Sequence, residues 1–233
     1  MFHKITGMIL SAVLLLNMSV SAAGFNDTKG HWAEQTINTL AERNVIDGIA
    51  PGAFAPDKEV TRAQYLKMIM EATGMSALPY RKGECLELNG SEWYAGYLQS
   101  ALDKGLVPSS MITGFKQKVE YKVDENGTAT ESKVVYSGAF NGDLVITREE
   151  MAVLTQYIYQ YTRTILTNKP TDIEQADSFS DDDNISSWAY TSVKLAAANG
   201  FIEGMDDGSF KPQNGATRAQ AATIFLRVSE KIK

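Results

Sequence analysis

Apolar positions at helical spacing predict two helices near the start of the chain. The first apolar face consists of Trp32, Ile37, Leu40 and Ala41. The second consists of Ala63, Leu66, Ile69 and Met70. Between them, prolines and glycines at residues 48–56 exclude a regular helix and predict a loop. The pattern is a helix that ends near residues 43–44, a loop, and a second helix.

This pattern occurs three times. The last copy keeps every marker of the first at an offset of 156 positions: Trp188, Gly204, Gly208, Phe210 and Thr217-Arg218-Ala219-Gln220 follow Trp32, Gly48, Gly52, Phe54 and Thr61-Arg62-Ala63-Gln64. The middle copy has Trp93, Gly138, Phe140 and Thr147-Arg148-Glu149-Glu150. Each second helix opens with Thr and has Gln or Glu three positions later, which is the capping-box pattern. The chain is therefore an array of three units.

The middle unit is longer than the others. Tryptophan and arginine are 30 positions apart in the first and last units and 55 apart in the middle one. The extra residues lie between Val107 and Gly138 and alternate in polarity around Asn126-Gly127, which predicts a β-hairpin. The hairpin is either a surface decoration or a docking edge for a partner.

The chain begins with a pattern typical of a secretory signal. A basic start at Lys4, an apolar run from Met8 to Leu16 and small residues at 19–23 predict cleavage after Ala22 or Ala23. A membrane anchor is the alternative, but the run is shorter than the about 20 apolar residues that a span requires. The boundaries that follow are 1–23 signal, 24–77 unit 1, 84–166 unit 2 with an insert at about 114–137, 167–178 linker and 179–233 unit 3.

Composition narrows the class of protein. The 233 residues carry a net charge of −6, which becomes −7 when the signal and its Lys4 are removed. An acidic chain argues against nucleic-acid binding, which requires a basic face. Cys85 is the single cysteine, so no internal disulfide can form and a packed core must stabilise the exported chain. We expect no membrane association after signal cleavage.

The repeated motifs resemble those of the S-layer homology family. The matching elements in unit 1 are Phe25-Asn26-Asp27, His31-Trp32-Ala33, the Gly-x-Phe-x-Pro loop and Thr61-Arg62-Ala63-Gln64. Unit 3 matches equally with Phe179-Ser180-Asp181, Trp188-Ala189, Gly208–Pro212 and Thr217–Gln220. Unit 2 departs from the pattern, because Pro108-Ser109 replaces Asp47-Gly48 and no Phe-x-Asp precedes Trp93.

The resemblance implies an all-α fold of three helix–loop–helix units in a pseudo-threefold arrangement, here with the hairpin inserted in unit 2. It also implies non-covalent anchoring to secondary cell-wall polysaccharide, often through a pyruvylated sugar held in grooves between repeats. The expected location is the cell wall or S-layer of a bacterial surface. The expected partners are a wall polysaccharide with anionic pyruvyl groups and, as a second class, other surface proteins.

Arginine directly after each helix cap is unfavourable locally, because a helix N-terminus already carries about half a positive charge. Backbone N–H groups together with a guanidinium make a candidate anion site. The alternative is internal pairing of each arginine, with Asp27 or Asp181 or with loop carbonyls. Arg62 and Arg218 are the stronger candidates, because the altered unit 2 loop and Glu149 weaken the case for Arg148.

The tryptophans and loop glycines each have two interpretations. A tryptophan at a helix start can stack on a sugar or pack in the core, and we favour packing with one edge at the groove. Gly48, Gly52, Gly204 and Gly208 are predicted to supply positive φ, while close approach to a ligand is compatible. The candidate ligand-binding residues are Arg62, Arg148, Arg218, Asp27, Asp181, Trp32, Trp93, Trp188, Gly48, Gly204, Thr61 and Thr217.

We expect no metal, no cofactor and no catalysis. The acidic stretches 181–184 and 206–208 lack the spaced oxygens and closing glutamate of a calcium loop, so a solvated surface is the better interpretation. No nucleophile motif or metal-ligand cluster is present in the sequence. The leading hypothesis is polysaccharide-mediated surface anchoring; the alternative is an envelope structural or adaptor protein that docks another protein through the hairpin.

Overall fold

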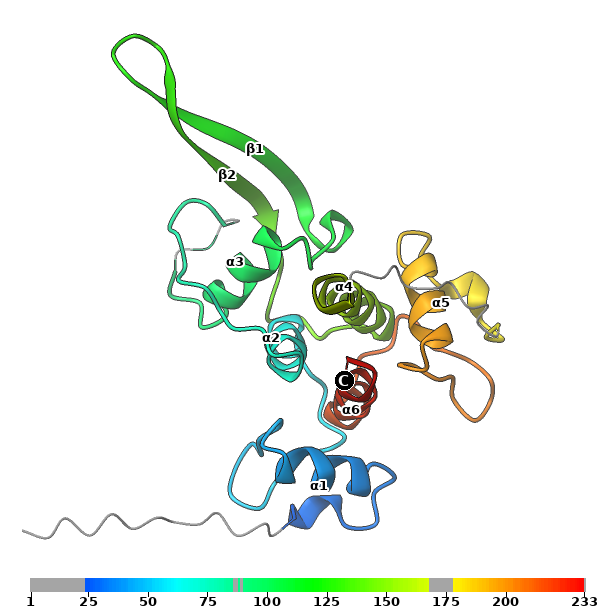
Figure 1. Ribbon diagram of the computed structural model, residues 1–233. Helices are drawn as coiled ribbons and strands as arrows, with labels where there is room; N and C mark the ends of the chain where they lie inside the picture. Colours follow the sequence, from blue (N-terminus) through cyan, green and yellow to red (C-terminus); the bar gives the residue numbers. More distant parts are fainter. Residues whose placement is uncertain (1–23, 86–87, 89, 168–177, 233) are drawn as a thin grey trace, which may run out of the picture.

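The computed structural model describes residues 24–85, 88, 90–167 and 178–232 (Figure 1). The predicted signal and most of the predicted linker lie outside these residues. The α-helices are α1 (Glu34–Glu42), α2 (Arg62–Ala72), α3 (Ala95–Asp103), α4 (Arg148–Thr167), α5 (Tyr190–Ala198) and α6 (Arg218–Ile232). The strands are β1 (Thr113–Val123) and β2 (Ala129–Ala139), and three short 3-10 helices span Asn26–Thr28, Ser109–Met111 and Asp182–Asn184.

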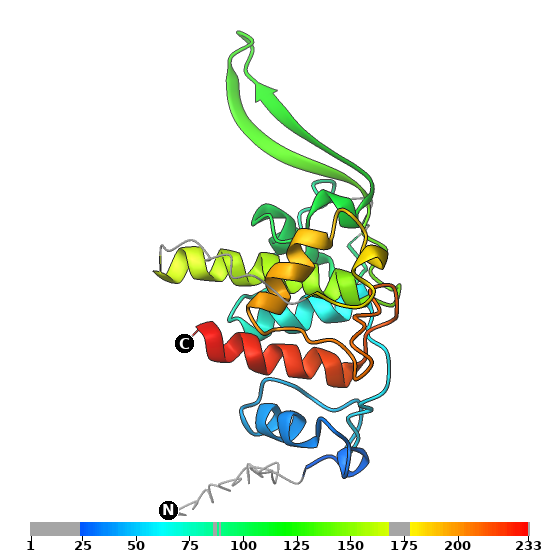
Figure 2. The same ribbon diagram turned by 90° about the vertical axis from the view of Figure 1, so that its right-hand side faces the viewer.

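The second helices of the three units, α2, α4 and α6, form the centre of the molecule. Figure 1 looks along them and Figure 2 shows them side by side. Small residues let them approach: Ala63 on α2, Ala152 on α4 and Ala222 on α6 are fully buried. Larger apolar side chains, among them Tyr65 and Phe225 with ring centroids 5.5 Å apart, fill the rest of the core.

The first helix of each unit packs on the second helix of the preceding unit. Helix α3 lies on α2, α5 lies on α4, and α1 lies on α6. The last of these contacts joins the first unit to the last, so the array closes on itself. Each helix of the outer layer has nine residues, which is too short for stability in isolation, so its stability comes from this packing.

A ring of three backbone hydrogen bonds links the units just before their second helices. Val60 N–H donates to Ala216 O (3.0 Å), Ala216 N–H to Ile146 O (2.9 Å) and Ile146 N–H to Val60 O (3.0 Å). All three residues are fully buried. Each unit therefore donates one bond and accepts one in the same closed cycle.

The inserted hairpin makes the predicted fold class wrong: the protein is mixed α/β rather than all-α. Strands β1 and β2 have 11 residues each and pair antiparallel, with Val119 opposite Val134 and Tyr121 opposite Ser132. The hairpin extends away from the helices (Figures 1 and 2). The hairpin itself was predicted, but it was treated as an addition to an all-α fold, whereas its two 11-residue strands are too large a part of the chain for that class.

None of the helices in the described ranges combines enough residues with enough apolar character to cross a bilayer.

Candidate ligand groove between units

The helix-start arginine of each unit reaches the loop of the next unit. Arg62 donates from Nη1 to Phe140 O (3.0 Å), Arg148 from Nε to Phe210 O (2.7 Å) and Arg218 from Nε to Phe54 O (2.7 Å). The guanidinium carbons of Arg148 and Arg218 also lie 4.8 Å and 4.4 Å from the ring centroids of the same phenylalanines. The arginines thus have a structural role that local helix propensity does not reveal.

The second contact of each arginine differs among the three interfaces. Nη2 of Arg148 donates to Glu203 O (3.2 Å), and Nη2 of Arg218 donates to Asp47 O (2.9 Å). Arg62 instead forms a two-pronged ion pair with Glu150, in which Nε donates to Oε2 (3.1 Å) and Nη2 to Oε1. Internal pairing with loop carbonyls, one of the two sequence interpretations, is therefore present at each interface.

The backbone N–H groups at the helix starts are not free, so that part of the anion-site prediction is wrong. The amides of Arg62, Arg148 and Arg218 donate to loop carbonyls of the next unit at 2.9 Å. The following residue does the same in each unit, as Ala63 does to Gly142 O (2.9 Å). Any anion at these interfaces must be recognised by side chains.

The loop aspartates position the carbonyls that the arginines contact. Asp27 accepts from Phe54 N (2.9 Å) and Ala55 N (2.7 Å), and Asp181 accepts from Phe210 N (2.6 Å) and Lys211 N (2.8 Å). These hydrogen bonds, that from Phe54 N–H first, hold the pKa of Asp27 below its ordinary value. Asp27 and Asp181 thus fix the loop conformation, with each arginine acting on them only through longer-range Coulomb attraction.

Thr61 and Thr217 cap their helices. Thr61 Oγ1 accepts from Gln64 N (3.3 Å) while Thr61 N donates to Gln64 Oε1 (3.1 Å), and Thr217 and Gln220 make the same pair of bonds at the same distances. Thr147 and Glu150 form the third capping box. The hydroxyl oxygens of Thr61 and Thr217 therefore accept hydrogen bonds from backbone N–H groups of their own helices.

The predicted role of the glycines holds at only half of the positions. Gly52 and Gly208 have φ of 72° and 76°, as predicted. For Gly48 and Gly204 the prediction of positive φ is wrong. A Cβ on Gly48 would lie 2.6 Å from Ala53 O, and one on Gly204 would lie 3.1 Å from Ser209 O. These glycines allow the two sides of the loop to approach each other.

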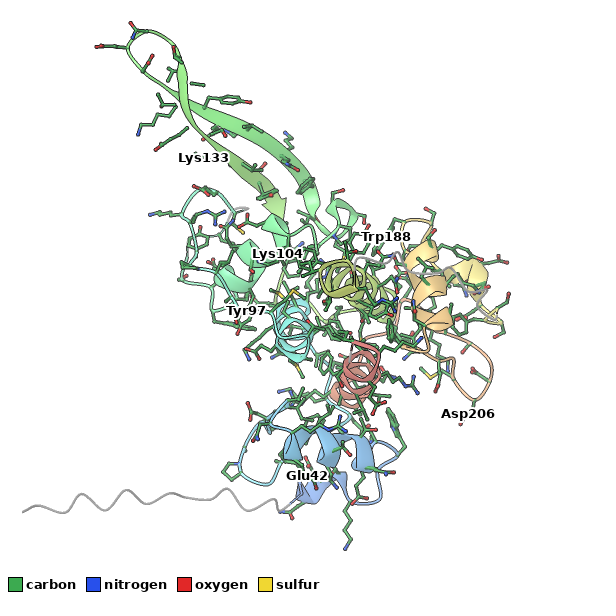
Figure 3. All side chains as sticks on the ribbon, viewed as in Figure 1. Glu42, Tyr97, Lys104, Lys133, Trp188 and Asp206 are labelled. Atoms are coloured by element: carbon green, nitrogen blue, oxygen red, sulfur yellow. The ribbon has the colours of Figure 1, made fainter. Side chains whose placement is uncertain are left out.

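The favoured interpretation of the tryptophans as core residues is wrong. Trp32, Trp93 and Trp188 are 64%, 54% and 38% exposed. Figure 3 shows Trp188 near the start of α5. The core contact at this point comes from the next residue, since Ala33, Tyr94 and Ala189 are buried. Exposed indole faces on this surface are available for stacking on a ligand.

One interface is hollowed into a groove of about 660 Å³. Its wall combines all three units: Trp32 from unit 1, Arg148 and Met151 from α4, and residues 201–207, 210 and 211 with α6 from unit 3. Gly204 lies in the same wall. The groove therefore brings together three of the candidate residues, Arg148, Trp32 and Gly204, although they are distant in sequence.

Arg148 is the distinctive charge of this groove. It is 6% exposed, and burial lowers its pKa to about 10, so it stays protonated at neutral pH. Within the described residues no carboxylate pairs with it, and its Nη1 has no hydrogen-bond partner. The other cations of the wall are paired, Arg227 with Glu203 (2.8 Å) and Lys211 with Asp207 (3.2 Å). Asp206 is exposed on the outer loop (Figure 3).

The sequence did not single out Glu150, Arg227 and Lys211 as site residues. Glu150 carried a detectable signal, because it is the one acidic residue at a capping position where the other units have Gln64 and Gln220. Arg227 and Lys211 carried none, since they join the groove through tertiary packing. As for metals, the described part of the chain holds no group of three or more His, Cys, Asp or Glu able to bind one.

Two of the three units match a known family model. A family model described as the S-layer homology domain matches residues 24–66 and 178–222. The chain is 30% identical to an amylopullulanase of Thermoanaerobacterium thermosulfurigenes and 31% identical to an exoglucanase of Acetivibrio thermocellus, over 89% of its own length in both cases. It is 26% identical over 52% of its length to a cellulosome-anchoring protein of Acetivibrio thermocellus. The chain spans only 10%, 16% and 28% of these proteins.

Proposed function

Because the chain is an S-layer homology protein of the bacterial cell surface, we propose that it anchors there by binding an acidic secondary cell-wall polysaccharide between its units. Surface anchoring itself follows from the family and from relatives named as surface-layer and cellulosome-anchoring proteins. The proposed ligand is a pyruvylated sugar of that polysaccharide. We propose no enzymatic activity, since the enzymes among the relatives share only a small part of their length with this chain.

The observation that supports this ligand is the Arg148 groove. A buried guanidinium without a carboxylate partner gains more from an anion than an exposed one, because the water that would screen the pair is excluded. Nη1 supplies the unused N–H groups. A pyruvyl ketal carries one carboxylate on a compact sugar, which matches one guanidinium in a groove of about 660 Å³.

Trp32 supplies the second half of the recognition. Its ring lines the same groove and is 64% exposed, which leaves an aromatic face open to solvent. Sugar rings have apolar C–H faces that pack on such aromatic surfaces. The groove thus offers an electrostatic contact for the acid and an apolar contact for the sugar.

Sedimentation with wall sacculi tests the proposal. The protein without residues 1–23 should pellet with sacculi that carry their secondary polymer and stay in solution with sacculi from which acid has removed it. Trp32→Ala should reduce affinity roughly fivefold, since an aromatic contact is worth about 1 kcal/mol. Because the Trp32 side chain is exposed, we expect the variant to remain folded, and its thermal unfolding checks this.

The matched control is Tyr121→Ala, which removes an aromatic residue of equal exposure, 65%, from the distant hairpin. It should bind as the unmodified protein does. Unmodified protein that remains in the supernatant, or that pellets equally with stripped sacculi, would refute polysaccharide anchoring.

Docking of another protein through the hairpin is the alternative. Its supporting observation is a row of exposed apolar side chains, Val119, Tyr121 and Val123, on β1. The row is exposed, with Val119 opposite Val134 on the paired strand, and no feature of it selects a partner. The paired contributions of Arg148 and Trp32 make polysaccharide binding the better-supported function.

A further inference from the structure

We propose that only two of the three unit interfaces accept the acidic group of the ligand, and that Glu150 excludes it from the third. This inference rests on the proposed function and refines it. The two accepting interfaces contain Arg148 and Arg218, and the excluding one contains Arg62.

The Arg62 interface already contains its anion. Glu150 engages Nε and Nη2 of Arg62, and Phe140 O takes Nη1, so each guanidinium nitrogen has a protein partner. Both side chains are largely buried, at 15% and 8% exposure. A ligand carboxylate would have to displace Glu150 and would meet a like charge in a site of low dielectric, which costs binding energy.

Glu150 is held in place by a second interaction. Its Oε2 accepts from Thr147 N (3.1 Å), and Thr147 Oγ1 accepts from Glu150 N (3.3 Å). The carboxylate is therefore part of the capping box and cannot swing away from Arg62 without uncapping α4. A fixed carboxylate is a stronger barrier to a second anion than a mobile one.

At the other two interfaces the capping residue is neutral. Gln220 lines the groove of Arg148, and Gln64 caps α2 at the corresponding place beside the Arg218 interface. Arg148 and Arg218 use Nε and Nη2 for carbonyl oxygens, and within the described residues Nη1 of each has no partner. Burial lowers the pKa of both guanidinium groups, so both gain from a compensating anion.

The rebuilt loop of unit 2 explains why Arg62 differs. Arg148 and Arg218 place Nη2 on the carbonyl that precedes Gly204 or Gly48. In unit 2 that glycine is replaced at Pro108-Ser109, and Nη2 of Arg62 goes to Glu150 instead. Since each arginine uses the loop of the following unit, the altered loop affects Arg62 rather than Arg148.

Two reciprocal substitutions test the proposal. Glu150→Gln keeps an oxygen for the Thr147 cap but removes the ion pair and should open the third interface. Gln220→Glu should introduce a carboxylate beside Arg148 and close its groove. Calorimetric titration with a methyl glycoside bearing a pyruvyl ketal should give two sites for the unmodified protein, three for Glu150→Gln and one for Gln220→Glu. The same glycoside without the ketal is the ligand control.

The outcomes separate the inference from the proposed function. Three sites in the unmodified protein, or two in both variants, would overturn the role of Glu150 while polysaccharide binding stands. No binding by the unmodified protein would overturn both. Thermal unfolding of each variant shows whether it is folded, and Gln220→Glu provides an independent answer because Glu already occupies this capping position in unit 2.

Discussion

At the scale of single residues, Asp27 connects stability to pH. Asp27 and Asp181 each accept two backbone N–H groups and thereby hold the carbonyls that the arginines contact. Ala55 and Lys211, which donate two of these bonds, have φ of 58° and 55°, a conformation that costs energy in a residue with a side chain. The carboxylates compensate for that cost.

Asp27→Asn should destabilise the protein at neutral pH by about 1 kcal/mol, because one charge-assisted hydrogen bond is lost. The pKa of Asp27 is lower in the folded protein than its ordinary value of 3.8. Its contribution is therefore complete above that value and disappears as pH falls through the lowered pKa. Thermal unfolding at about pH 7 and about pH 3 should show the difference narrowing in acid.

Asp183→Asn is the matched control, since Asp183 is an exposed acid of unit 3. Asp183→Asn should leave the midpoint of thermal unfolding unchanged at both pH values. An Asp27→Asn protein whose thermal unfolding midpoint equals that of the unmodified protein at neutral pH would contradict the stabilising role of Asp27.

Residues that act on their own neighbours were predictable, and those that act across units were not. The Thr61 cap depends on Gln64 three positions later, so the local sequence was sufficient. The partner of Arg148 is 62 positions away, and no spacing rule identifies it. The prediction that Trp32 is buried failed for a related reason. The exposure of Trp32 depends on how α1 lies on α6, and a large aromatic residue is usually buried.

At the scale of elements, the base of the hairpin is attached to the rest of the protein, whereas its outer half is not. The base of the hairpin is held by Tyr136, whose N–H donates to Glu84 O (3.0 Å) and whose ring stacks on Phe115 with centroids 6.4 Å apart. Farther out, the side chains of β1 are exposed, and Figure 3 shows Lys133 of β2 well away from the helices. The outer half therefore adds little to the core.

Shortening the hairpin should leave stability and glycan binding intact. Removing residues 118–135 and joining Gln117 to Tyr136, which are opposite each other, through Asn-Gly preserves the base. We expect a change in unfolding free energy within about 0.5 kcal/mol, as for surface changes. Denaturant titration and sacculus sedimentation measure the two properties.

Tyr136→Ala, in contrast, should cost roughly 2 kcal/mol because it removes a half-buried ring. A shortened protein that no longer pellets with sacculi would assign the hairpin a direct part in wall binding and would contradict this prediction.

At the scale of the whole molecule, closure of the array should make unfolding a single cooperative event. In open repeat arrays each repeat contacts only its neighbours along the chain, so ends can unfold separately. Here α1 packs on α6, and Arg218 of the last unit bonds to Phe54 of the first. Unit 1 cannot detach without exposing the core face of α6.

Ile37→Ala in α1 should therefore destabilise all three units together, by about 2–5 kcal/mol, since Ile37 is fully buried. The three units contain one tryptophan each, so three variants that retain only Trp32, Trp93 or Trp188 report on each unit by fluorescence. Their urea midpoints should coincide and shift equally on Ile37→Ala. A shift confined to the Trp32 variant would show that unit 1 unfolds independently.

The backbone cycle of Val60, Ala216 and Ile146 also limits how such a protein can grow. An open solenoid lengthens by gaining repeats at its ends, but a closed cycle has no end to extend. A fourth unit would require every crossing angle around the axis to change. New sequence is tolerated only on the periphery, within a unit, which is where unit 2 carries its 27-residue hairpin segment, Thr113–Ala139. Diversity in this architecture is therefore expected to accumulate as insertions on three fixed sectors rather than as a variable number of repeats.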